Sequence, residues 1–391
     1  MKTVCIIAEY NPFHNGHAYQ INYAREKLGA DTVLVVMSGP FVQRGEPALT
    51  DKVSRTRAAL EAGADLVAEL PPAFALGGAE TFARGAVGLA EASGCVDELL
   101  FGTAGADSDR LLCLAEQAEQ EKTEQMLRIK LREGLSYPAA LTEALCETEP
   151  DAGKWLTDPN TVLGLEYIRA LRRQGSRIRP VALKRSGSAY HDLSLPADGF
   201  ASASALRRAI GNGMAPDSLA AYAPPVSLAA CGTPLFPDDL SAALSSALLR
   251  LAGGGKEAFL PFADVNEALA ARILEAAPFT ETFSELTDRI RTRAFTAARI
   301  RRALLHILLN IRKEEQEGVP ESIKILGLRK DSPLPGRLRE TAKRPVISKT
   351  ADAAPPLVRA YAPAQSLYAQ CIYFKYGKKL ADDYRQSPIV L

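Results

Sequence analysis

The stretch that decides the fold lies close to the start of the chain and reads "IIAEYNPFHNGHAYQINYAREKLG", residues 6–29. A short apolar run ends at residue 8, and a tight loop rich in Asn, Pro and His follows it. An amphipathic stretch with helical spacing then begins near residue 16. The order strand, tight loop, helix predicts the first βα unit of a parallel sheet, where ligands bind beyond the carboxyl ends of the strands.

Two of the four histidines, His14 and His17, lie in this loop on either side of Gly16. A helix that starts near Asn15 points unpaired backbone N–H groups and the positive end of its dipole at the loop. Gly16 lets an anion approach the backbone, and the two imidazoles, one turn apart, can face the same anion. The pattern favours a nucleotide phosphate, because such donors stabilise the charge that develops during phosphoryl transfer.

Two other interpretations of the histidines remain. They can be ordinary surface or core residues, or an H-x-x-H pair that binds a metal, although no third ligand is evident nearby. The chain has no Walker G-x-x-x-x-G-K-[ST] and no G-x-G-x-x-G after the first strand. The segment "GGGK", residues 253–256, is followed by Glu257 and is typical of a loop that ends a helix. We expect no dedicated metal site.

The composition is that of a globular protein of two or three domains, with 391 residues, 47% apolar and 24% charged. No run approaches the roughly 18 apolar residues of a membrane helix. The apolar run at residues 4–8 is too short for a signal peptide, so we expect a cytoplasmic protein with no membrane partner. The six cysteines are scattered without a C-x-x-C pair, which is typical of reduced thiols.

The first hundred residues alternate between two hydrophobic periods. Strand-like runs rich in β-branched residues occur at 3–7, 32–37, 65–70 and 97–101. Helical patterns lie between them, at 16–28, 52–62 and 79–92. Strands joined by single helices predict right-handed βαβ units, and therefore an α/β fold with a parallel sheet covered by helices.

The remainder is expected to be mainly helical. Helical patterns occur at 107–134, 138–147, 158–175, 201–213, 240–251, 265–276 and 294–313, with one further strand at 178–185. Strand patterns nearly vanish after residue 214, and Pro-rich stretches at 331–345 and 355–364 are expected to be loops. We therefore expect a boundary between residues 211 and 237 that separates an α/β domain, residues 1–212, from a mainly helical region, residues 213–391.

Charge is unevenly distributed along the chain. Residues 289–349 hold 16 Lys and Arg against 6 Asp and Glu, an excess of +10 in a protein whose formal net charge is +1. The predicted helix at 294–313 places apolar residues on one face and a polar group on the other, namely Arg299, Arg302, His306 and Lys313. A charged face is often simply solvated, but this excess favours RNA backbone binding. The candidate RNA-binding residues are Arg299, Arg302, Lys313, Arg329 and Lys330.

His14-Asn15-Gly16-His17 matches the H-x-G-H signature of the nucleotidylyltransferase superfamily, and further motifs narrow the match. They are "AEYNPFHNGH" (8–17), "VMSGPFVQRGEPA" (36–48), "DLVAELP" (65–71), "FGT" (101–103), "DPNTVLGLEYIRAL" (158–171), "KRSGSAYHD" (184–192) and "ASASALRRAI" (201–210). Taken jointly and in order, they resemble the tRNA(Met) cytidine acetate ligase family. The resemblance is strong over residues 1–212 and agrees in kind with the basic helical remainder.

This resemblance implies a Rossmann-like sheet of the nucleotidylyltransferase type and a two-step reaction. ATP and acetate give acetyl-adenylate and pyrophosphate, and the acetyl group then passes to N4 of the wobble cytidine of elongator tRNA(Met), with release of AMP. ATP is therefore the expected co-substrate, accompanied by Mg²⁺. The lone pair of a cytosine amine is delocalised into the ring, so the acyl donor must be activated. The activated intermediate reacts with water, so the site should be closed while it exists.

The resemblance also implies roles for individual residues. His14 and His17 would act on the phosphates around the α-phosphorus as catalytic residues. The implied ATP site comprises Ile7, Ala8, Glu9, Tyr10, Asn11, Pro12, Phe13, His14, Asn15, Gly16, His17, Gln20, Gly102, Asn160, Arg185, Ser186, Ser202, Ser204 and Arg207. Where the family often has a Ser–Glu pair after the glycine at 102, this chain has Thr103–Ala104.

Several of these positions also have a purely structural interpretation. Gly102 would let adenosine approach the backbone, or it is an ordinary turn glycine. Asn160 follows Pro159 and would contact a base or ribose, or it is a helix N-cap. Ser202, Ser204 and Arg207 resemble a second phosphate-binding element, a hydroxyl-rich helix start with Arg one turn later.

The segment "SGPFVQRGEPA", residues 38–48, is a conspicuous loop after the second strand. Gln43 and Arg44 near its tip are predicted to shape the acetate or cytosine pocket, with Asp51, Lys52 and Arg55 at the same rim. An ordinary βα loop is the alternative.

Two rival functions also fit parts of the sequence. A nucleotidylyltransferase that acts on a small phosphorylated metabolite would explain H-x-G-H but leaves the basic segment without a task. A non-enzymatic RNA-binding protein would explain the basic segment and predicts no ATP-dependent chemistry.

Overall fold

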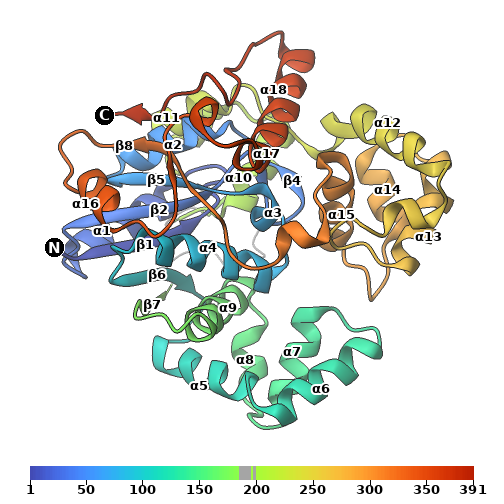
Figure 1. Ribbon diagram of the computed structural model, residues 1–391, viewed down its shortest axis with the longest axis horizontal. Helices are drawn as coiled ribbons and strands as arrows, with labels where there is room; N and C mark the ends of the chain where they lie inside the picture. The colour runs from blue at the N-terminus through green and yellow to red at the C-terminus, as the bar shows by residue number, and fades with distance from the viewer. Residues whose placement is uncertain (185–194, 197–199) are drawn as a thin grey trace.

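A computed structural model describes residues 1–184, 195–196 and 200–391 (Figure 1). Five parallel strands form the centre of its main sheet in the order β5-β2-β1-β6-β7. Their bounds are β1 Thr3–Ala8, β2 Thr32–Ser38, β5 Leu66–Leu70, β6 Glu98–Thr103 and β7 Arg179–Lys184. All five agree with the predicted strands to within about two residues, which confirms the α/β fold.

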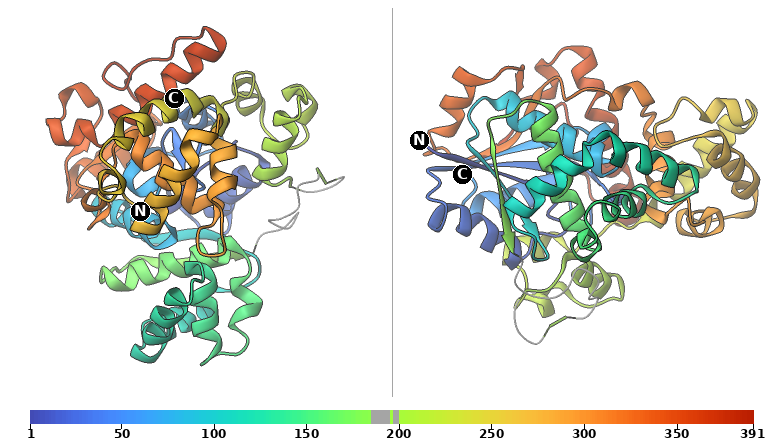
Figure 2. Two further views of the ribbon diagram at one scale, coloured as in Figure 1. Left: turned by 90° about the vertical axis from the view of Figure 1, so that its right-hand side faces the viewer. Right: turned by 90° about the horizontal axis from the view of Figure 1, so that it is seen from below.

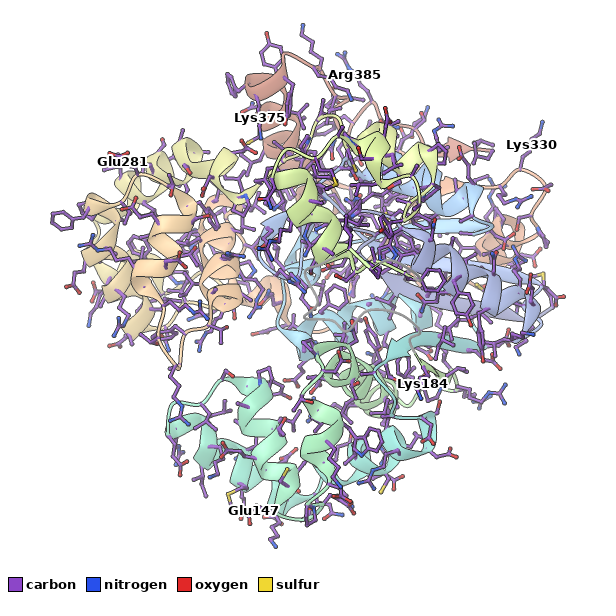
Figure 3. All side chains as sticks on the ribbon, turned by 180° about the vertical axis from the view of Figure 1, so that it is seen from behind. Glu147, Lys184, Glu281, Lys330, Lys375 and Arg385 are labelled. Atoms are coloured by element: carbon purple, nitrogen blue, oxygen red, sulfur yellow. The ribbon has the colours of Figure 1, made fainter. Side chains whose placement is uncertain are left out.

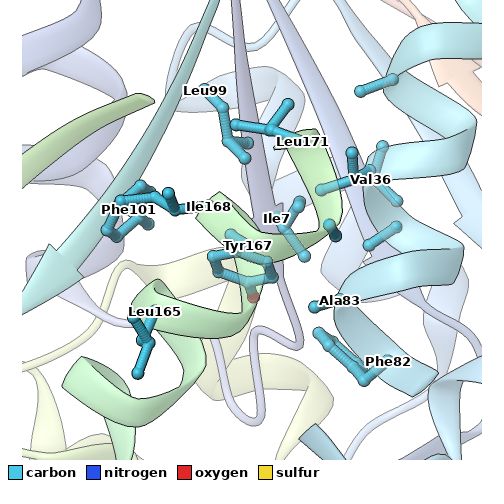
Figure 4. Packing of buried hydrophobic residues seen from close by; sticks show 14 of the residues in the cluster. Ile7, Val36, Phe82, Ala83, Leu99, Phe101, Leu165, Tyr167, Ile168 and Leu171 are labelled. Atoms are coloured by element: carbon cyan, nitrogen blue, oxygen red, sulfur yellow. The ribbon is translucent and has the colours of Figure 1, made fainter. Parts of the chain in front are cut away.

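Alternating side chains of β1 and β2 serve two separate cores. Val4 and Ile6 face α1 (Asn15–Glu26) and α2 (Lys52–Glu61) on one side of the sheet. Cys5 and Ile7 face α4 (Ala79–Ser93) and α9 (Pro159–Arg173) on the other, as Figure 4 shows for Ile7. Strands buried on both faces must be apolar at every position, which explains their nearly continuous hydrophobic runs.

Two helical lobes flank the sheet. The first, inserted between β6 and β7, projects below the sheet in Figure 1 and in the left view of Figure 2. It comprises α5 Ser108–Ala118, α6 Glu121–Arg132, α7 Tyr137–Cys146 and α8 Ala152–Leu156. The second has its own apolar core and comprises α12 Ser241–Ala252, α13 Glu267–Ala276, α14 Phe283–Ile290 and α15 Ala297–Leu309. Between β7 and this second lobe lie α10 Ala203–Gly211 and α11 Pro225–Ala230.

Strand patterns nearly vanish after residue 214, yet the structure has strands there that join the main sheet. β8 (Ile323–Leu328) joins the main sheet antiparallel to β5, and the short strands β9 (Val346–Ile347) and β10 (Ile389–Val390) pair with β8 in parallel. Two stretches expected as loops also contain helices, α16 (Leu334–Thr341) and α17 (Pro355–Arg359), and α18 (Ala362–Tyr376) follows. The sheet thus takes strands from both sides of residue 212, the predicted domain boundary.

A buried cluster of four charges explains why the sequence pattern does not predict β8 as a strand. Lys324 interrupts the apolar run of this strand, yet it is 4% exposed and pairs with Glu69 of β5 and with Asp383. Lys52 of α2 completes the cluster, with its Nζ 2.9 Å from Glu69 and 2.6 Å from Asp383. Each charge is compensated only by partners distant in the sequence, so the cluster cannot be inferred from local pattern.

Candidate active site

A cavity of about 260 Å³ opens beyond the carboxyl ends of the parallel strands, where the first βα junction predicts it. Most of the predicted ATP-site and pocket residues line it: Ile7, Ala8, Glu9, Tyr10, Asn11, His14, Gly16, His17, Gln20, Gln43, Arg44, Gly102, Asn160, Ser202, Ser204 and Arg207. Lys184 lines it as well, whereas Arg185 and Ser186 lie outside the described residues.

Three residues of the predicted ATP segment do not line the cavity. Pro12 and Phe13 are buried, and the Phe13 ring packs 4.8 Å from that of Tyr10 and 5.6 Å from that of His17, measured between centroids. Asn15 turns the other way, because its backbone N–H donates to the Tyr222 carbonyl at 2.8 Å and its side chain to Ala221 at 3.0 Å. These residues stabilise the loop through contacts on the side that faces away from the cavity.

The two histidines form a reciprocal cap at the start of α1. His14 Nδ1 accepts from the Gly16 N–H at 3.1 Å, and His17 Nδ1 accepts from the His14 N–H at 3.2 Å. An imidazole that accepts at Nδ1 carries its proton at Nε2 in the neutral form, so the cap makes Nε2 the donor nitrogen of each ring. The rings are stacked with centroids 3.7 Å apart. The motif therefore fixes both tautomers and holds two N–H donors together.

A second helix N-terminus meets the first across the cavity. Ser202 caps α10, its Oγ accepting from the Ala205 N–H at 3.1 Å. Arg207, one turn on, donates to the Asn11 carbonyl at 2.6 Å and to Ser204 Oγ at 3.2 Å. The guanidinium thus ties the α10 element to the β1–α1 loop. Both helix starts direct backbone N–H groups at the same space, an arrangement suited to a chain of phosphates.

The opposite end of the cavity is formed by β6 and α9. Asp158, rather than Asn160, is the N-cap of α9, since its carboxylate accepts from the Thr161 N–H at 2.8 Å. The N-cap interpretation of Asn160 is therefore wrong, and its side chain lines the cavity beside Gly102. Thr103 is buried and donates to the Ala106 carbonyl, whereas Ala104 is exposed, and neither residue lines the cavity.

An apolar wall contributes residues that the sequence did not single out. Phe82 of α4, Phe101 of β6 and Tyr167 of α9 line the cavity, and Figure 4 shows these three rings as members of one apolar cluster. Burial raises the pKa of the Tyr167 phenol well above its ordinary value, and the charge of Glu9 raises it further. Phe82 and Tyr167 occupy apolar-face positions of helices, where sequence spacing cannot distinguish a cavity wall from ordinary core.

The loop after β2 forms a small hairpin, β3 (Phe41–Val42) with β4 (Glu46–Pro47), and Gln43 and Arg44 at its tip reach the cavity. Gly45 has φ +74°, and a Cβ there would lie 2.5 Å from the Arg302 backbone nitrogen. Glu46 forms an ion pair with Arg301 of α15. The hairpin therefore lies between the cavity and the second helical lobe.

The expected rim residues after this hairpin lie beneath it instead. Arg55 is buried and donates to the carbonyls of Glu9, Ser38, Gly39 and Thr50. Asp51 caps α2 through the Ser54 N–H at 2.9 Å, and Lys52 belongs to the buried charge cluster. They hold the loop in place and do not face a ligand.

The structure shows that some residues of the predicted basic helix face are buried and others are exposed. His306 is not on an exposed face; it is fully buried, its Nδ1 lies 3.0 Å from the Ala263 carbonyl, and burial lowers its pKa. Arg302 is largely buried, with Nε 2.9 Å from Asp264. Burial opposes ionisation of Asp264, but Arg302 and His306 hold its pKa below the usual value. Lys313 is exposed, and Arg299 lies over the Phe295 ring at 5.0 Å.

Arg329 and Lys330 lie elsewhere. Because β8 runs antiparallel to β5, its end meets the start of β5, and the Arg329 N–H donates to the Asp65 carbonyl. This is the amino edge of the sheet, opposite the cavity, and Figure 3 shows Lys330 projecting at the far side of the molecule from the second lobe. The basic segment is continuous in sequence and divided in space, so the five residues do not form one surface.

In the part of the chain that the structure describes, no group of His, Cys, Asp or Glu is placed to hold a metal ion. All six cysteines are free thiols. None of the described helices is long and apolar enough to cross a membrane.

Comparisons with known proteins found similar sequences and similar structures. Residues 1–383 match the HIGH Nucleotidyl Transferase family. The chain is 37% identical over 382 residues to the tRNA(Met) cytidine acetate ligase of Syntrophotalea carbinolica, covering 94% of this chain and 90% of that protein. It is 33% identical to the protein of the same name from Acetivibrio thermocellus, with full coverage of both.

Solved structures of Thermotoga maritima TmcAL are similar over their whole length. The form bound with alpha-thio ATP has a TM-score of 0.89 at 28% identity, with full coverage of both chains. The apo form has a TM-score of 0.91 at the same identity and coverage.

Proposed function

The chain belongs to the HIGH nucleotidyl transferase family, where its full-length relatives are tRNA(Met) cytidine acetate ligases, and we propose how its residues carry out that reaction. It is an ATP-dependent ligase that joins acetate to a cytidine of tRNA. In the proposed route acetate first attacks the α-phosphorus of ATP and forms acetyl-adenylate. The acetyl group then passes to N4 of the wobble cytidine of elongator tRNA(Met), and AMP leaves.

The adenylation step is assigned to the two facing helix starts. The triphosphate lies between the N-termini of α1 and α10, and the Nε2 donors of His14 and His17 contact oxygens around the α-phosphorus. These donors are already in place, so they stabilise the charge that develops as the carboxylate oxygen attacks and pyrophosphate leaves. Arg207 and Lys184, both at the cavity, carry the positive charge that balances the phosphates. Mg²⁺, if bound with ATP, would neutralise part of the charge on its phosphates.

Adenosine is assigned to the β6–α9 end of the cavity, against Gly102 and Asn160. The closely packed glycine lets the base approach the backbone, and the amide can donate and accept. Arg185 and Ser186 directly follow Lys184 in the sequence, and for this reason we also assign them to the phosphates. The acyl group and the cytosine are assigned to the other end, beside Gln43 and Arg44.

tRNA is assigned to the surface of the second lobe that continues from this end. Arg299 and Lys313 belong to it, and exposed arginines at 291 and 293 extend it towards the first lobe, where Ala294 approaches Gly134. Contacts to phosphates fix the register of the RNA, and a wobble base in an anticodon loop is unpaired and can leave its stack at low cost. The proposed location is the cytoplasm, where tRNA is used.

The observation that carries the proposal is the reciprocal His14–His17 cap, which directs two N–H donors into a cavity between two helix starts. The test is one reaction with ATP, [¹⁴C]acetate and tRNA, followed by nucleoside mass analysis, and in parallel acetate-dependent ATP–pyrophosphate exchange without tRNA. N4-acetylcytidine at the wobble position together with exchange is the expected result. Exchange that does not depend on acetate, or label in another nucleoside, would contradict it.

A further inference from the structure

Among the described residues that line the cavity, Glu9 is the one acid. It follows β1 directly and therefore lies at the centre of the carboxyl edge, between the β2 side and the β6 side of the sheet. The side chains around the phosphate region are donors or cations instead, among them His14, His17 and Arg207.

Specific contacts hold Glu9 in place. Its backbone carbonyl accepts from buried Arg55 at 2.7 Å, which anchors the main chain from below. Its side chain accepts from the Gln43 N–H at 2.7 Å through Oε1, which turns the carboxylate towards the β3–β4 hairpin. No described residue donates a hydrogen bond to Oε2, and no described cation forms an ion pair with Glu9. One carboxylate oxygen is thus fixed and the other is available.

A carboxylate in this position is unfavourable for the anionic parts of the ligand. It repels the phosphates and the acetate, so its presence indicates a ligand group that carries an N–H donor. The reaction brings two such amines, N6 of adenine and N4 of cytosine. The Gln43 contact turns the carboxylate to the β2 side of β1, whereas Gly102, to which adenosine is assigned, lies on β6 at the other side. The amine opposite Glu9 is therefore N4 of cytosine, since carboxylates read cytosine through this amine.

We propose that Glu9 binds the N4 amine of the target cytidine and is the general base of acetyl transfer. This inference rests on the proposed function and names a catalytic residue for its second step. It moves Glu9 from the ATP site, where the resemblance places it, to the cytidine side of the cavity, because its carboxylate is turned towards the β3–β4 hairpin. N4 forms a bond to the acyl carbon of acetyl-adenylate, the bond from that carbon to the phosphate oxygen breaks, and AMP leaves with the electron pair. One proton of the amine passes to the carboxylate of Glu9 and is later released to water.

The test separates the two half-reactions in Glu9→Gln. The glutamine amide oxygen can still accept from the Gln43 N–H, so the loop contact is kept while the base is lost. Glu26→Gln, a change at an exposed position on α1, is the matched control. Three rates are measured for each variant: acetate-dependent ATP–pyrophosphate exchange, tRNA binding, and single-turnover transfer to tRNA from acetyl-adenylate formed on the enzyme. Glu9→Asp, which keeps a carboxylate, is the conservative variant.

The proposal expects Glu9→Gln to keep exchange and tRNA binding near wild type while transfer falls by ~10²-fold or more, the usual size of general-base catalysis. Glu9→Asp should recover part of the transfer rate, and Glu26→Gln should match wild type. A raised KM for ATP in the exchange reaction would assign Glu9 to adenine and overturn the proposal, as would unchanged transfer. Wild-type enzyme without acetate-dependent exchange would overturn the proposed function itself, which is a separate result.

Discussion

Arg207 of α10 donates a 2.6 Å hydrogen bond to the backbone carbonyl of Asn11, and so joins the two proposed phosphate-binding elements, which lie almost two hundred residues apart in the chain. Neither element forms the cavity alone. Arg207 therefore links the two elements directly and also supplies charge at the cavity. We expect Arg207→Lys, which loses the forked geometry of the guanidinium, to raise the KM for ATP in the exchange reaction by ~10-fold or more. An unchanged KM would show that the fork is not needed.

The cap and the catalytic donor of His14 can be separated. Asn is a good N-cap, so His14→Asn should keep the Gly16 hydrogen bond and remove only the Nε2 donor. We expect acetate-dependent exchange to fall by ~10²–10³-fold in both His14→Asn and His14→Ala. Only the alanine variant should also lose about 1 kcal/mol of stability in denaturant unfolding. Full exchange activity in His14→Asn would contradict the assigned role.

The β3–β4 hairpin should tolerate no side chain at Gly45. Its φ is +74°, and a Cβ would lie 2.5 Å from the Arg302 nitrogen and 2.6 Å from the Arg301 side chain. Gly29 has φ +65° and no atom within 4 Å, so Gly29→Ala measures the backbone strain alone, about 1–2 kcal/mol. We expect Gly45→Ala to be destabilised more than Gly29→Ala and, because the hairpin moves, to lose transfer to tRNA. Equal stability of the two variants in urea would contradict this prediction, because it would show that α15 shifts to make room for the Cβ at no cost.

The buried charge cluster should depend on Asp383. Asp383→Asn leaves Lys52 and Lys324 with Glu69 as their only acidic partner in the cluster, at an expected cost of about 3–5 kcal/mol. Asp382→Asn removes an exposed pair with Arg385 and should cost less than about 1 kcal/mol. Denaturant midpoints compare the two, and equal midpoints would contradict the assignment.

The same cluster predicts a pH dependence. Burial alone would raise the pKa of Asp383, but the charges of Lys52 and Lys324 hold it below its ordinary value. A depressed folded-state pKa gives stability that is complete above the unfolded value and is lost as the pH falls through the folded one. Wild-type protein should therefore lose this contribution below about pH 4, and Asp383→Asn should lack that part of the profile. Parallel curves of unfolding free energy against pH for wild type and Asp383→Asn would contradict the prediction.

Lys313 and Lys330 give a matched pair for the proposed RNA surface, because both are exposed lysines in different places. The Lys313 backbone N–H donates to the Pro261 carbonyl beside the second lobe, and the Lys330 backbone N–H donates to the Leu391 carbonyl. Lys313→Glu should weaken tRNA binding and reduce the slope of log affinity against log salt by about 1 or more. Lys330→Glu, at the amino edge of the sheet, should leave both unchanged. An effect of Lys330→Glu without an effect of Lys313→Glu would indicate that tRNA binds at the amino edge of the sheet instead.

Much of the site could be predicted from the sequence because its determinants are local. A strand, a turn and a helix cap within the first thirty residues bring His14, Gly16 and His17 together, and the spacing alone indicates this. The helix start at 201–210 is also predicted from local pattern, whereas its phosphate-binding role comes only from the family resemblance. Asp158 and Asn160 are both good N-cap residues, and they lie on either side of Pro159. Proline favours the first position of a helix, so the residue before it, Asp158, is the better candidate for the N-cap.

What could not be predicted depends on distant partners. β8 contains Lys324, whose charge is compensated by Glu69 and Asp383, and no local pattern contains those three residues together. His306 occupies a polar stripe of its helix yet is covered by the segment at Ala263. Phe82 and Tyr167 look like core residues because a cavity wall and a core share the same periodicity.

The late arrival of β8 has a consequence for synthesis on the ribosome. β5 emerges more than 250 residues before the strand that covers its open side, so the nascent sheet presents unpaired backbone groups and a lone Lys52–Glu69 pair for most of translation. A fragment that stops at residue 212 retains this exposed edge permanently. Truncation at that point should therefore favour aggregation through the open edge, and adenylation should be measured on the intact polypeptide.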